Sequence, residues 1–209
     1  IVGVREFWGL EFTVSPAVLI PRPESEFIVE EAVARLGDGT PRVADVGTGS
    51  GCIAVSIAHL RPRAQLVATD ISAPALALAE ANARRHATAN VEFRLGDGYV
   101  PVAGAQFDVI VANPPYVAAG NPHLELGDLR YEPPHALASG PDGLELMRRL
   151  VAEAPRHLRA GGWLLVEHGH DQAEPVRELL EAAGLRDLSS ARDLAGMPRA
   201  GAGRLTLKP

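Results

Sequence analysis

The stretch Arg42-Val43-Ala44-Asp45-Val46-Gly47-Thr48-Gly49-Ser50-Gly51-Cys52-Ile53-Ala54-Val55 predicts a buried strand, a glycine turn and the start of a helix. Glycines at every second position of the turn let the backbone adopt unusual φ/ψ values and approach a ligand closely. The first N–H groups of the helix have no partner within it, so they would face the same ligand. Because the turn follows a strand and opens a helix, it indicates a ligand site.

The spacing of these glycines differs from the G-x-G-x-x-G pattern of dinucleotide-binding folds, and Asp45 stands just before the turn. A carboxylate there would repel a pyrophosphate and attract the cationic amino-acid end of a ligand. We therefore expect S-adenosylmethionine, and not NAD, as the cofactor. The candidate binding residues in this stretch are Asp45, Gly47, Thr48, Gly49, Ser50 and Gly51.

Carboxylates also follow the next two predicted strands. Asp70 ends the strand Gln65–Thr69, where it is placed to accept hydrogen bonds from two ribose hydroxyls. It could instead cap the helix that starts near Ser72, but the glycine turn upstream favours ribose binding. After the third strand comes Asp97, which could meet an adenine amino group. We include Asp97 and Gly98 among the candidate cofactor residues.

The fourth predicted strand, Phe107–Ala112, is stopped by Asn113-Pro114-Pro115-Tyr116. Each proline fixes φ near −65° and donates no backbone N–H, and the first one pushes Asn113 into an extended conformation. The result is a stiff loop at the carboxyl end of a strand, which is where open α/β sheets bind ligands. Its amide side chain and carbonyl groups are acceptors that suit a substrate –NH2 group. A plain turn that ends the strand is the alternative.

Periodicity and turn residues predict the remaining elements. A hairpin around Gly9 is expected in Glu6–Val14, followed by a stiff proline-rich segment, Val14–Glu26, that lies across a pocket. An irregular stretch runs from Tyr116 to Gly143, and a stretch of that length in a compact domain is usually functional. The other expected elements are a helix from about Glu24 to Leu36, a helix from near Ser72 to His86, a strand at Val91–Leu95, a helix from Leu144 to Leu158 interrupted or kinked at Pro155 and closed by Gly161-Gly162, a strand at Trp163–Glu167, a helix from Ala173 to Ala183, and strands at Leu185–Leu188 and Arg204–Leu207.

This alternation of strands and helices predicts an α/β fold. We expect a mainly parallel seven-stranded sheet with helices on both faces, and a small N-terminal β-hairpin. Residues 1–36 would contain the hairpin, the proline-rich cover segment and the first helix, and residues 37–209 the cofactor-binding domain.

The composition excludes several classes of protein. The 209 residues carry a formal net charge of −6, which gives no general attraction to nucleic acid or to an anionic membrane. Cys52 is the only cysteine, so no disulfide framework is expected. His168-Gly169-His170-Asp171 has no matching ligand pair elsewhere, so we expect no metal site.

We expect a cytoplasmic protein, because no signal peptide or membrane span is visible. We also expect a piece of a longer chain, because Ile1 is not an initiator methionine.

Together these features resemble class I S-adenosylmethionine-dependent methyltransferases that act on a planar –NH2 nitrogen, and within them the release-factor glutamine N5-methyltransferases (HemK/PrmC). The resemblance covers nearly the whole chain, and Ser25 stands where that family usually has threonine. It implies a Rossmann-like class I methyltransferase fold in residues 37–209, with residues 1–36 on the linker side of an N-terminal helical domain that is missing here. The segments that carry it are Val18-Leu19-Ile20-Pro21-Arg22-Pro23-Glu24-Ser25-Glu26, Asn113-Pro114-Pro115-Tyr116, Glu132-Pro133, Glu167-His168-Gly169 and Arg192-Asp193-Leu194-Ala195-Gly196.

The resemblance also implies an activity. The enzyme would methylate the side-chain amide of the glutamine in the Gly-Gly-Gln motif of class I peptide-chain release factors, leaving S-adenosyl-L-homocysteine and modulating translation termination. Asn113 and Pro114 would accept the two N–H bonds of the amide, and Tyr116 would pack against its plane. These three residues are the catalytic candidates, and with Pro115 they form the candidate substrate site. No strong general base is required, because the proton can leave after the nitrogen has attacked.

Three alternatives remain. A glutamine methyltransferase acting on a ribosomal protein would use the same pocket. A nucleic-acid amino-methyltransferase also carries Asn-Pro-Pro-Tyr and grips a flipped base with it, but such enzymes usually have basic grooves or a target-recognition domain. A non-catalytic S-adenosylmethionine-binding scaffold would need a damaged Asn113 or glycine turn, and both are intact.

Overall fold

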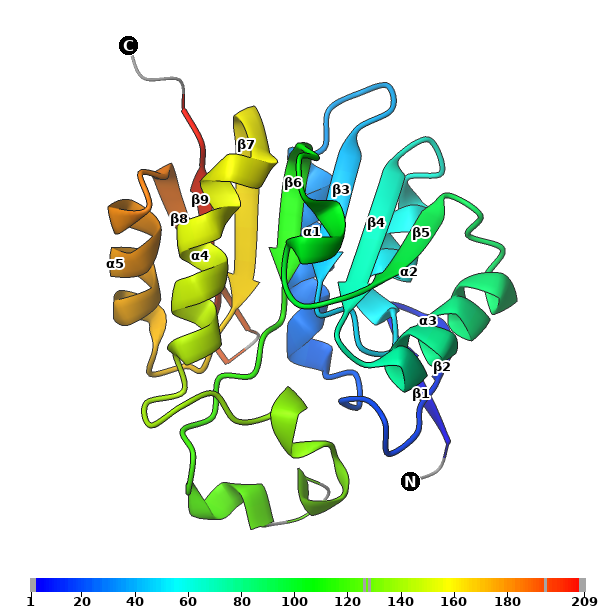
Figure 1. Cartoon of the computed structure of the whole chain (residues 1–209), viewed down its shortest axis with the longest axis vertical. Coiled ribbons are helices and arrows are strands. Elements are labelled where there is room, and N and C mark those ends of the chain that lie inside the picture. The colour runs from blue at the N-terminus through cyan, green and yellow to red at the C-terminus, as the bar shows by residue number, and fades with distance from the viewer. Residues whose placement is uncertain (1–2, 126, 128, 194, 207–209) are drawn as a thin grey trace.

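The strand before the glycine turn, β3, lies inside a seven-stranded sheet between β4 and β6 (Figure 1). The computed structural model describes residues 3–206 except 126, 128 and 194. Strand order is β5-β4-β3-β6-β7-β9-β8; the first five strands are parallel, and β9 runs antiparallel to both of its neighbours. The seven strands are β3 (Arg42–Val46), β4 (Gln65–Asp70), β5 (Val91–Leu95), β6 (Phe107–Ala112), β7 (Leu158–Glu167), β8 (Arg186–Arg192) and β9 (Pro198–Arg204).

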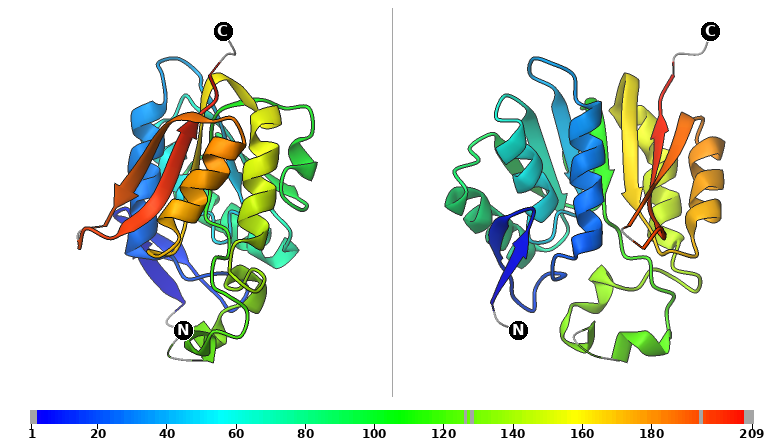
Figure 2. Two further views of the ribbon diagram at one scale, coloured as in Figure 1. Left: turned by 90° about the vertical axis from the view of Figure 1, so that its left-hand side faces the viewer. Right: turned by 180° about the vertical axis from the view of Figure 1, so that it is seen from behind.

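Helices cover both faces of the sheet, as predicted, and Figure 2 shows the two layers from the side and from behind. One core lies under α1, α2 and α3 and the other under α4 and α5, so buried strands such as β6 contribute apolar side chains to both. The five α-helices are α1 (Glu26–Arg35), α2 (Cys52–Leu60), α3 (Ala73–Arg85), α4 (Glu145–His157) and α5 (Ala173–Ala182).

The predicted N-terminal hairpin is confirmed as β1 (Val4–Phe7) and β2 (Leu10–Thr13). Its two turn residues, Trp8 and Gly9, have φ values of 52° and 69°, which match the twist of a tight hairpin. Phe7 and Phe12 are buried in the core that also contains the apolar face of α1. The hairpin therefore packs onto the body of the protein beside α3.

The predicted helices are confirmed with small differences at their ends, and the predicted role of Gly161-Gly162 is wrong. The helix expected from about Glu24 begins with one turn of 3₁₀ helix, η1 (Pro23–Ser25), before α1. Helix α4 continues past Pro155 to His157, because a proline near the end of a helix removes only one of its last hydrogen bonds. Gly161 and Gly162 do not close this helix: they lie inside β7, which begins at Leu158.

The last two strands differ most from the prediction. Instead of Leu185–Leu188 and Arg204–Leu207, the sheet ends with β8 (Arg186–Arg192) and β9 (Pro198–Arg204); residue 207 lies outside the described residues. Strand β9 has the sequence Pro-Arg-Ala-Gly-Ala-Gly-Arg, which contains no β-branched or aromatic residue. Its glycines allow close packing, since a Cβ on Gly201 would lie 3.1 Å from Val176 Cγ1 of α5.

The carboxyl ends of the parallel strands face the irregular segment 117–143, which lies beyond them at the lower end of Figure 1. The described residues of this segment form short 3₁₀ turns and one isolated β-bridge between Val117 and Ala138. The turns are η3 (Pro122–Glu125), η4 (Leu129–Tyr131) and η5 (Pro134–Ala136). A further turn, η2 (Val100–Val102), precedes β6. Across the part of the chain that the structure describes, no helix has the length and apolar character needed to cross a membrane.

Candidate functional site

A hollow with about 700 Å³ of empty space lies at the carboxyl ends of β3, β4 and β6. Six of the candidate cofactor residues line it: Gly47, Gly49, Asp70, Asp97, Gly98 and Asn113. Pro114 and Pro115 line it as well, so the structure brings the predicted cofactor and substrate residues together in one cavity.

The glycine turn leaves room for a ligand on one side and packs tightly on the other. Gly47 and Gly49 have φ values of 78° and 56°, and a Cβ on either would meet no atom within 4 Å. Gly51, with φ of 81°, has the opposite environment: its Cβ would lie 3.0 Å from Ala79 Cβ. The first two glycines therefore open the hollow, whereas the third lets α2 approach α3.

Asp70 lies at the tip of β4 and connects it to the glycine turn. Its Oδ2 accepts the Gly49 N–H and its Oδ1 accepts the Ser72 N–H, both at 2.9 Å. Ser72 in turn caps α3 by accepting the Ala75 N–H. Asp70 therefore holds the capping residue and does not itself cap α3, as its alternative interpretation would require, and it also lines the hollow. Each carboxylate oxygen can accept a second hydrogen bond.

Asp45 lies beneath the turn and does not line the hollow; its residue is 1% exposed. Oδ2 accepts hydrogen bonds from Thr48 Oγ1 at 2.6 Å and from the Ala54 N–H at 3.2 Å. Oδ1 is buried without a hydrogen-bond partner among the described residues. Burial raises the pKa of this carboxyl to about 7, although the bonds from Thr48 and Ala54 favour its ionised form.

This pKa shift predicts a pH-dependent loss of stability. Because the folded protein holds the Asp45 proton more tightly than the unfolded chain, stability from this group is present below about pH 4 and is lost as pH rises through about 7. Asp45→Asn should therefore lose less stability than the parent protein between pH 5 and pH 8. Urea unfolding at the two pH values measures this, with exposed Asp38→Asn as the control. Equal losses in Asp45→Asn and the parent protein would contradict it.

The other predicted residues of the turn are buried and do not line the hollow. Thr48 and Ser50 are 6% and 2% exposed, and the Ser50 carbonyl accepts a hydrogen bond from Asn82 Nδ2 at 2.9 Å. Asp97, in contrast, is at the surface of the hollow, where its Oδ1 accepts a hydrogen bond from Arg149 of α4 at 2.6 Å.

At the end of β6, Asn113 is held by side chains from distant parts of the chain. Its Nδ2 donates to Ser25 Oγ at 3.0 Å, and Ser25 Oγ donates to Glu167 Oε2 at 2.5 Å. The Tyr116 hydroxyl donates to Glu167 Oε1 at 3.2 Å. None of the described residues donates a hydrogen bond to Asn113 Oδ1 or to the Pro114 carbonyl. These two oxygens are therefore free to accept hydrogen bonds from a substrate.

Two segments cover the hollow, and an ion pair joins them. Ala17, Val18 and Leu19 line it from the proline-rich segment, and His135 and Ala136 line it from segment 117–143. Arg22 of the first segment pairs with Glu132 of the second, which also accepts the Ile20 N–H at 3.4 Å. The Glu132 side chain is fully buried and the Arg22 side chain is 28% exposed, so the pair is partly shielded from water and fixes the two covers to each other.

The residue that precedes α5 holds the Tyr116 carbonyl in place. Gln172 Nε2, just before that helix, donates to the Tyr116 carbonyl at 2.9 Å and to the Asp142 carbonyl at 3.3 Å. Gly143 packs directly against the same carbonyl: a Cβ there would lie 2.2 Å from Tyr116 O. The position of the loop Asn113–Tyr116 thus depends on Gln172 and Gly143.

Sequence reasoning gave no role to Ser25, Glu167, Gln172 or His135. The resemblance marked the segments that contain Ser25 and Glu167, but nothing in the spacing indicates that these side chains meet at Asn113. Near Glu167, His168 is buried with its Nδ1 beside the Gly169 carbonyl. Among the described residues, no group of three His, Cys, Asp or Glu side chains is arranged to hold a metal ion.

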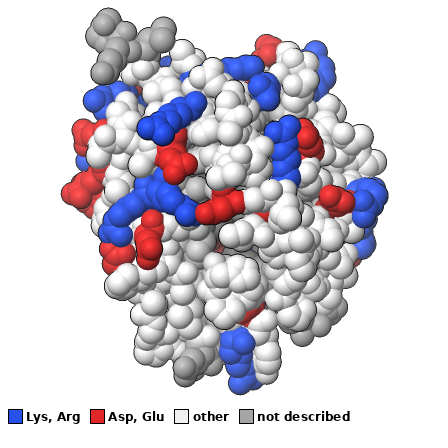
Figure 3. Space-filling model, viewed as in Figure 1, with Lys and Arg blue, Asp and Glu red and all other residues white. Residues whose placement is uncertain are grey.

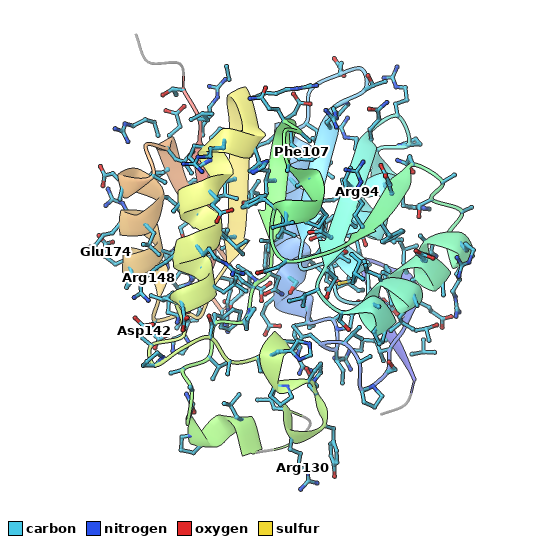
Figure 4. The ribbon with its side chains drawn as sticks, in the orientation of Figure 1. Arg94, Phe107, Arg130, Asp142, Arg148 and Glu174 are labelled. Carbon is cyan, nitrogen blue, oxygen red and sulfur yellow. The ribbon has the colours of Figure 1, made fainter. Side chains whose placement is uncertain are left out.

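Charges are interspersed on the face that carries α4 and segment 117–143 (Figure 3). Basic and acidic side chains alternate over α4 and α5, and the area over the segment is mostly uncharged. Figure 4 shows Arg130 pointing outward from the segment, and Asp142 beside Arg148 at the start of α4, where the two form an ion pair. A continuous basic stripe, which is typical of nucleic-acid binding, does not occur on this face.

Comparisons with known proteins place this site in context. The family described as methyltransferase small domain matches residues 24–128. A release factor glutamine methyltransferase of Xylella fastidiosa strain Temecula1 is 53% identical, over 98% of this chain and 74% of the relative. Proteins of the same name from Bordetella pertussis and Escherichia coli K12 are 50% and 42% identical, over 98% of this chain and 76% and 74% of theirs.

Solved structures share the fold at lower identity. A methyltransferase from Pyrococcus furiosus superposes with a TM-score of 0.70 at 20% identity, covering 96% of this chain and 91% of that one. A ribosomal protein L11 methylase from Lactobacillus delbrueckii subsp. bulgaricus gives a TM-score of 0.65, also at 20% identity, covering 93% and 84%. At this identity the likeness concerns the fold alone.

Proposed function

We propose that this chain methylates the side-chain amide of a glutamine in a peptide-chain release factor, because it belongs to the family of release factor glutamine methyltransferases. The substrate residue would be the glutamine of the Gly-Gly-Gln motif in class I release factors. The reaction would take place in the cytoplasm, where these factors act during translation termination.

The observation that carries the proposal is the pair of acceptors at the end of β6. Asn113 Oδ1 and the Pro114 carbonyl lie on a stiff loop beside the hollow and have no donor among the described residues. A primary amide has two N–H bonds, which these oxygens can accept together. Its nitrogen is a weak nucleophile because its lone pair is delocalised, so fixing its direction is the main help that a protein can give.

The hollow also fits S-adenosylmethionine. The backbone at Gly47 and Gly49 is open to a close approach, and Asp70 can accept further hydrogen bonds from a ribose. We propose that Gly47, Gly49, Asp70, Asp97, Gly98 and Asn113 line the cofactor site, with Asp45, Thr48, Ser50 and Gly51 supporting its floor. When bound, this cofactor supplies an electrophilic methyl group and leaves as neutral S-adenosylhomocysteine.

Within this site the chain's own residues hold and shield the reacting amide. Asn113 and Pro114 orient the nitrogen, and Pro115 also lines the hollow beside it. We place Tyr116, the next residue of the loop, against the plane of the amide. With this donor bound, an N–C bond would form as the donor's S–C bond breaks, and the amide nitrogen would then release its proton to solvent. The two covers joined by Arg22 and Glu132 limit the entry of water.

Removing Asp70 should weaken the cofactor site. Asp70→Ala loses an acceptor for the ribose and also the bonds to the Gly49 and Ser72 N–H groups. We expect S-adenosylmethionine affinity to fall about 10- to 100-fold, as for the loss of a charged hydrogen bond. Calorimetric titration measures this, and thermal unfolding without ligand checks that the variant is folded. Unchanged affinity in a folded variant would remove Asp70 from the site.

A panel of methyl acceptors tests the substrate. The protein is incubated with S-adenosylmethionine carrying a labelled methyl group and, separately, with a class I release factor, ribosomal proteins, DNA or RNA. We expect label in the release factor, and none when the glutamine of its Gly-Gly-Gln motif is replaced by alanine. Labelling of a ribosomal protein or a nucleic acid in preference to the release factor would overturn the proposal.

A further inference from the structure

Four polar side chains form a continuous hydrogen-bond chain beside the acceptor pair; its two middle members, Ser25 and Glu167, are buried, and its ends, Asn113 and Tyr116, are half-buried. It runs from the Tyr116 hydroxyl to Glu167, from Glu167 to Ser25 and from Ser25 to Asn113, with distances of 3.2, 2.5 and 3.0 Å. Ser25 and Glu167 are each 2% exposed. Neither lines the hollow, so neither can touch a ligand there directly.

The direction of the hydrogen bonds in this chain is fixed by which groups can donate. Asn113 Nδ2 can only donate, so Ser25 Oγ accepts from it. The single hydroxyl hydrogen of Ser25 is then available for Glu167 Oε2, and the Tyr116 hydroxyl gives its hydrogen to Oε1. Both oxygens of Glu167 accept in this arrangement, which requires the ionised carboxylate.

We propose that ionised Glu167, acting through Ser25, is a positioning residue that turns the Asn113 amide so that its oxygen faces the substrate nitrogen. This inference rests on the proposed function. Protonation of Glu167 reverses the direction of the hydrogen bonds, because the neutral acid then donates to Ser25 and the serine hydrogen turns toward Asn113. If Asn113 Oδ1 accepts the hydrogen of Ser25, the –NH2 group of Asn113 faces the substrate. An amide –NH2 group donates hydrogen bonds and does not accept them, so it cannot accept the N–H bond of the substrate amide.

The groups around Glu167 place its titration in the working range of pH. Burial raises its pKa to about 7, the bonds from Ser25 and Tyr116 and the nearby Asn113 amide favour the ionised form, and Glu24 opposes it. Burial also raises the pKa of the Tyr116 phenol, so Tyr116 remains a donor.

Three other groups face the chain from neighbouring elements. Cys52 of α2 stays a neutral thiol, because burial raises its pKa to about 12. Burial lowers the pKa of His168, and Arg199 of β9 faces both Tyr116 and His168 as a cation. Of these groups, Glu167 is the one whose change of charge would alter the hydrogen-bond chain.

Glu167→Gln tests the inference, because glutamine keeps the shape but offers one acceptor and one donor where the carboxylate has two acceptors. We expect kcat on the release factor to fall about 10- to 100-fold, as for a misplaced transition-state acceptor, with the affinity for S-adenosylmethionine retained. The kcat of the parent protein should decrease as pH falls below about 7, and the kcat of the variant should not show this decrease.

Changes at Ser25 provide the matched pair. Ser25→Ala breaks the chain and should reduce kcat about 10-fold or more, whereas Ser25→Thr keeps the hydroxyl and should restore it. Unchanged kcat in Glu167→Gln or Ser25→Ala, or an acid limb that persists in Glu167→Gln, would overturn the inference. So would equal losses in Ser25→Thr and Ser25→Ala, which would indicate a packing role. A parent protein inactive on release factors would instead refute the proposed function.

Discussion

Asn113→Ala is expected to lower kcat for release-factor methylation by about 10³-fold, the effect of removing a preorganised transition-state acceptor. The change deletes Oδ1, one of the two oxygens that have no donor among the described residues. It leaves the glycine turn, Asp70 and Asp97 in place, so the affinity for S-adenosylmethionine should change little. The expected pattern is thus a collapse of catalysis with cofactor binding preserved.

Steady-state kinetics and calorimetric titration of the same Asn113→Ala preparation separate the two effects. Thermal unfolding serves as the control, because the substitution also removes the donor to Ser25 Oγ. An equal loss of cofactor affinity and turnover would mean that Asn113 serves mainly the cofactor. Turnover near that of the parent protein would rule out the proposed orientation of the amide.

Gly143→Ala is expected to reduce kcat by about 10²-fold, as a displacement near 1 Å at a reacting group can do. Gly143 has φ of 77°, and its added Cβ would lie 2.2 Å from the Tyr116 carbonyl oxygen and 2.9 Å from Gln172 Nε2. Backbone atoms cannot yield as a flexible side chain can, so the loop that carries Pro114 and Tyr116 must shift. Cofactor affinity should be affected far less than turnover, because the glycine turn lies on another strand end.

Gly120→Ala is the matched control. Gly120 belongs to the same irregular segment and has a similar φ of 80°, but a Cβ there would meet nothing within 4 Å. Both substitutions therefore introduce the same backbone strain, and only Gly143→Ala adds the clash. Similar kcat values for the two variants would show that the Tyr116 carbonyl does not need its observed position.

The buried parallel strands could be predicted because their residues carry a strong local signal. The strand Phe107–Ala112 is an apolar run that is interrupted by Asp108 and followed by two prolines, and its observed bounds agree with the prediction. Strand β9 has no such signal. It is held by its neighbours, where Gly201 and Gly203 let α5 and Leu185 approach closely, and a local pattern cannot contain that information.

Gly161 and Gly162 show a second limit. A glycine pair after a helical pattern predicts the end of a helix, yet here it lies within β7. Gly161 donates to the Leu205 carbonyl at 2.7 Å, and Gly162 accepts from the Leu205 N–H at 2.8 Å. A Cβ on Gly162 would lie 3.0 Å from the Phe107 carbonyl oxygen. The glycine pair therefore allows close packing at an irregular part of the sheet, where the pairing of β6 and β7 shifts register.

In the candidate site, too, some features could be predicted from local sequence and others depend on tertiary packing. The glycine turn and the Asn-Pro-Pro-Tyr loop are local motifs whose residue types suit a ligand, and the structure gathers most of them around one hollow. Ser25 and Glu167 are 142 residues apart, and they meet only because η1 and β7 are adjacent in the fold. A partnership of this kind depends on tertiary packing, so spacing in the sequence cannot reveal it.

The most direct test of the proposed chemistry is to locate the transferred methyl group. A class I release factor is incubated with the protein and S-adenosylmethionine, digested and analysed by fragmentation mass spectrometry. We expect one added methyl group on the side-chain nitrogen of the glutamine in the Gly-Gly-Gln motif, and none after incubation with Asn113→Ala under the same conditions. A methyl group on another residue of the release factor, or an unmodified glutamine after prolonged incubation with active protein, would contradict the proposal.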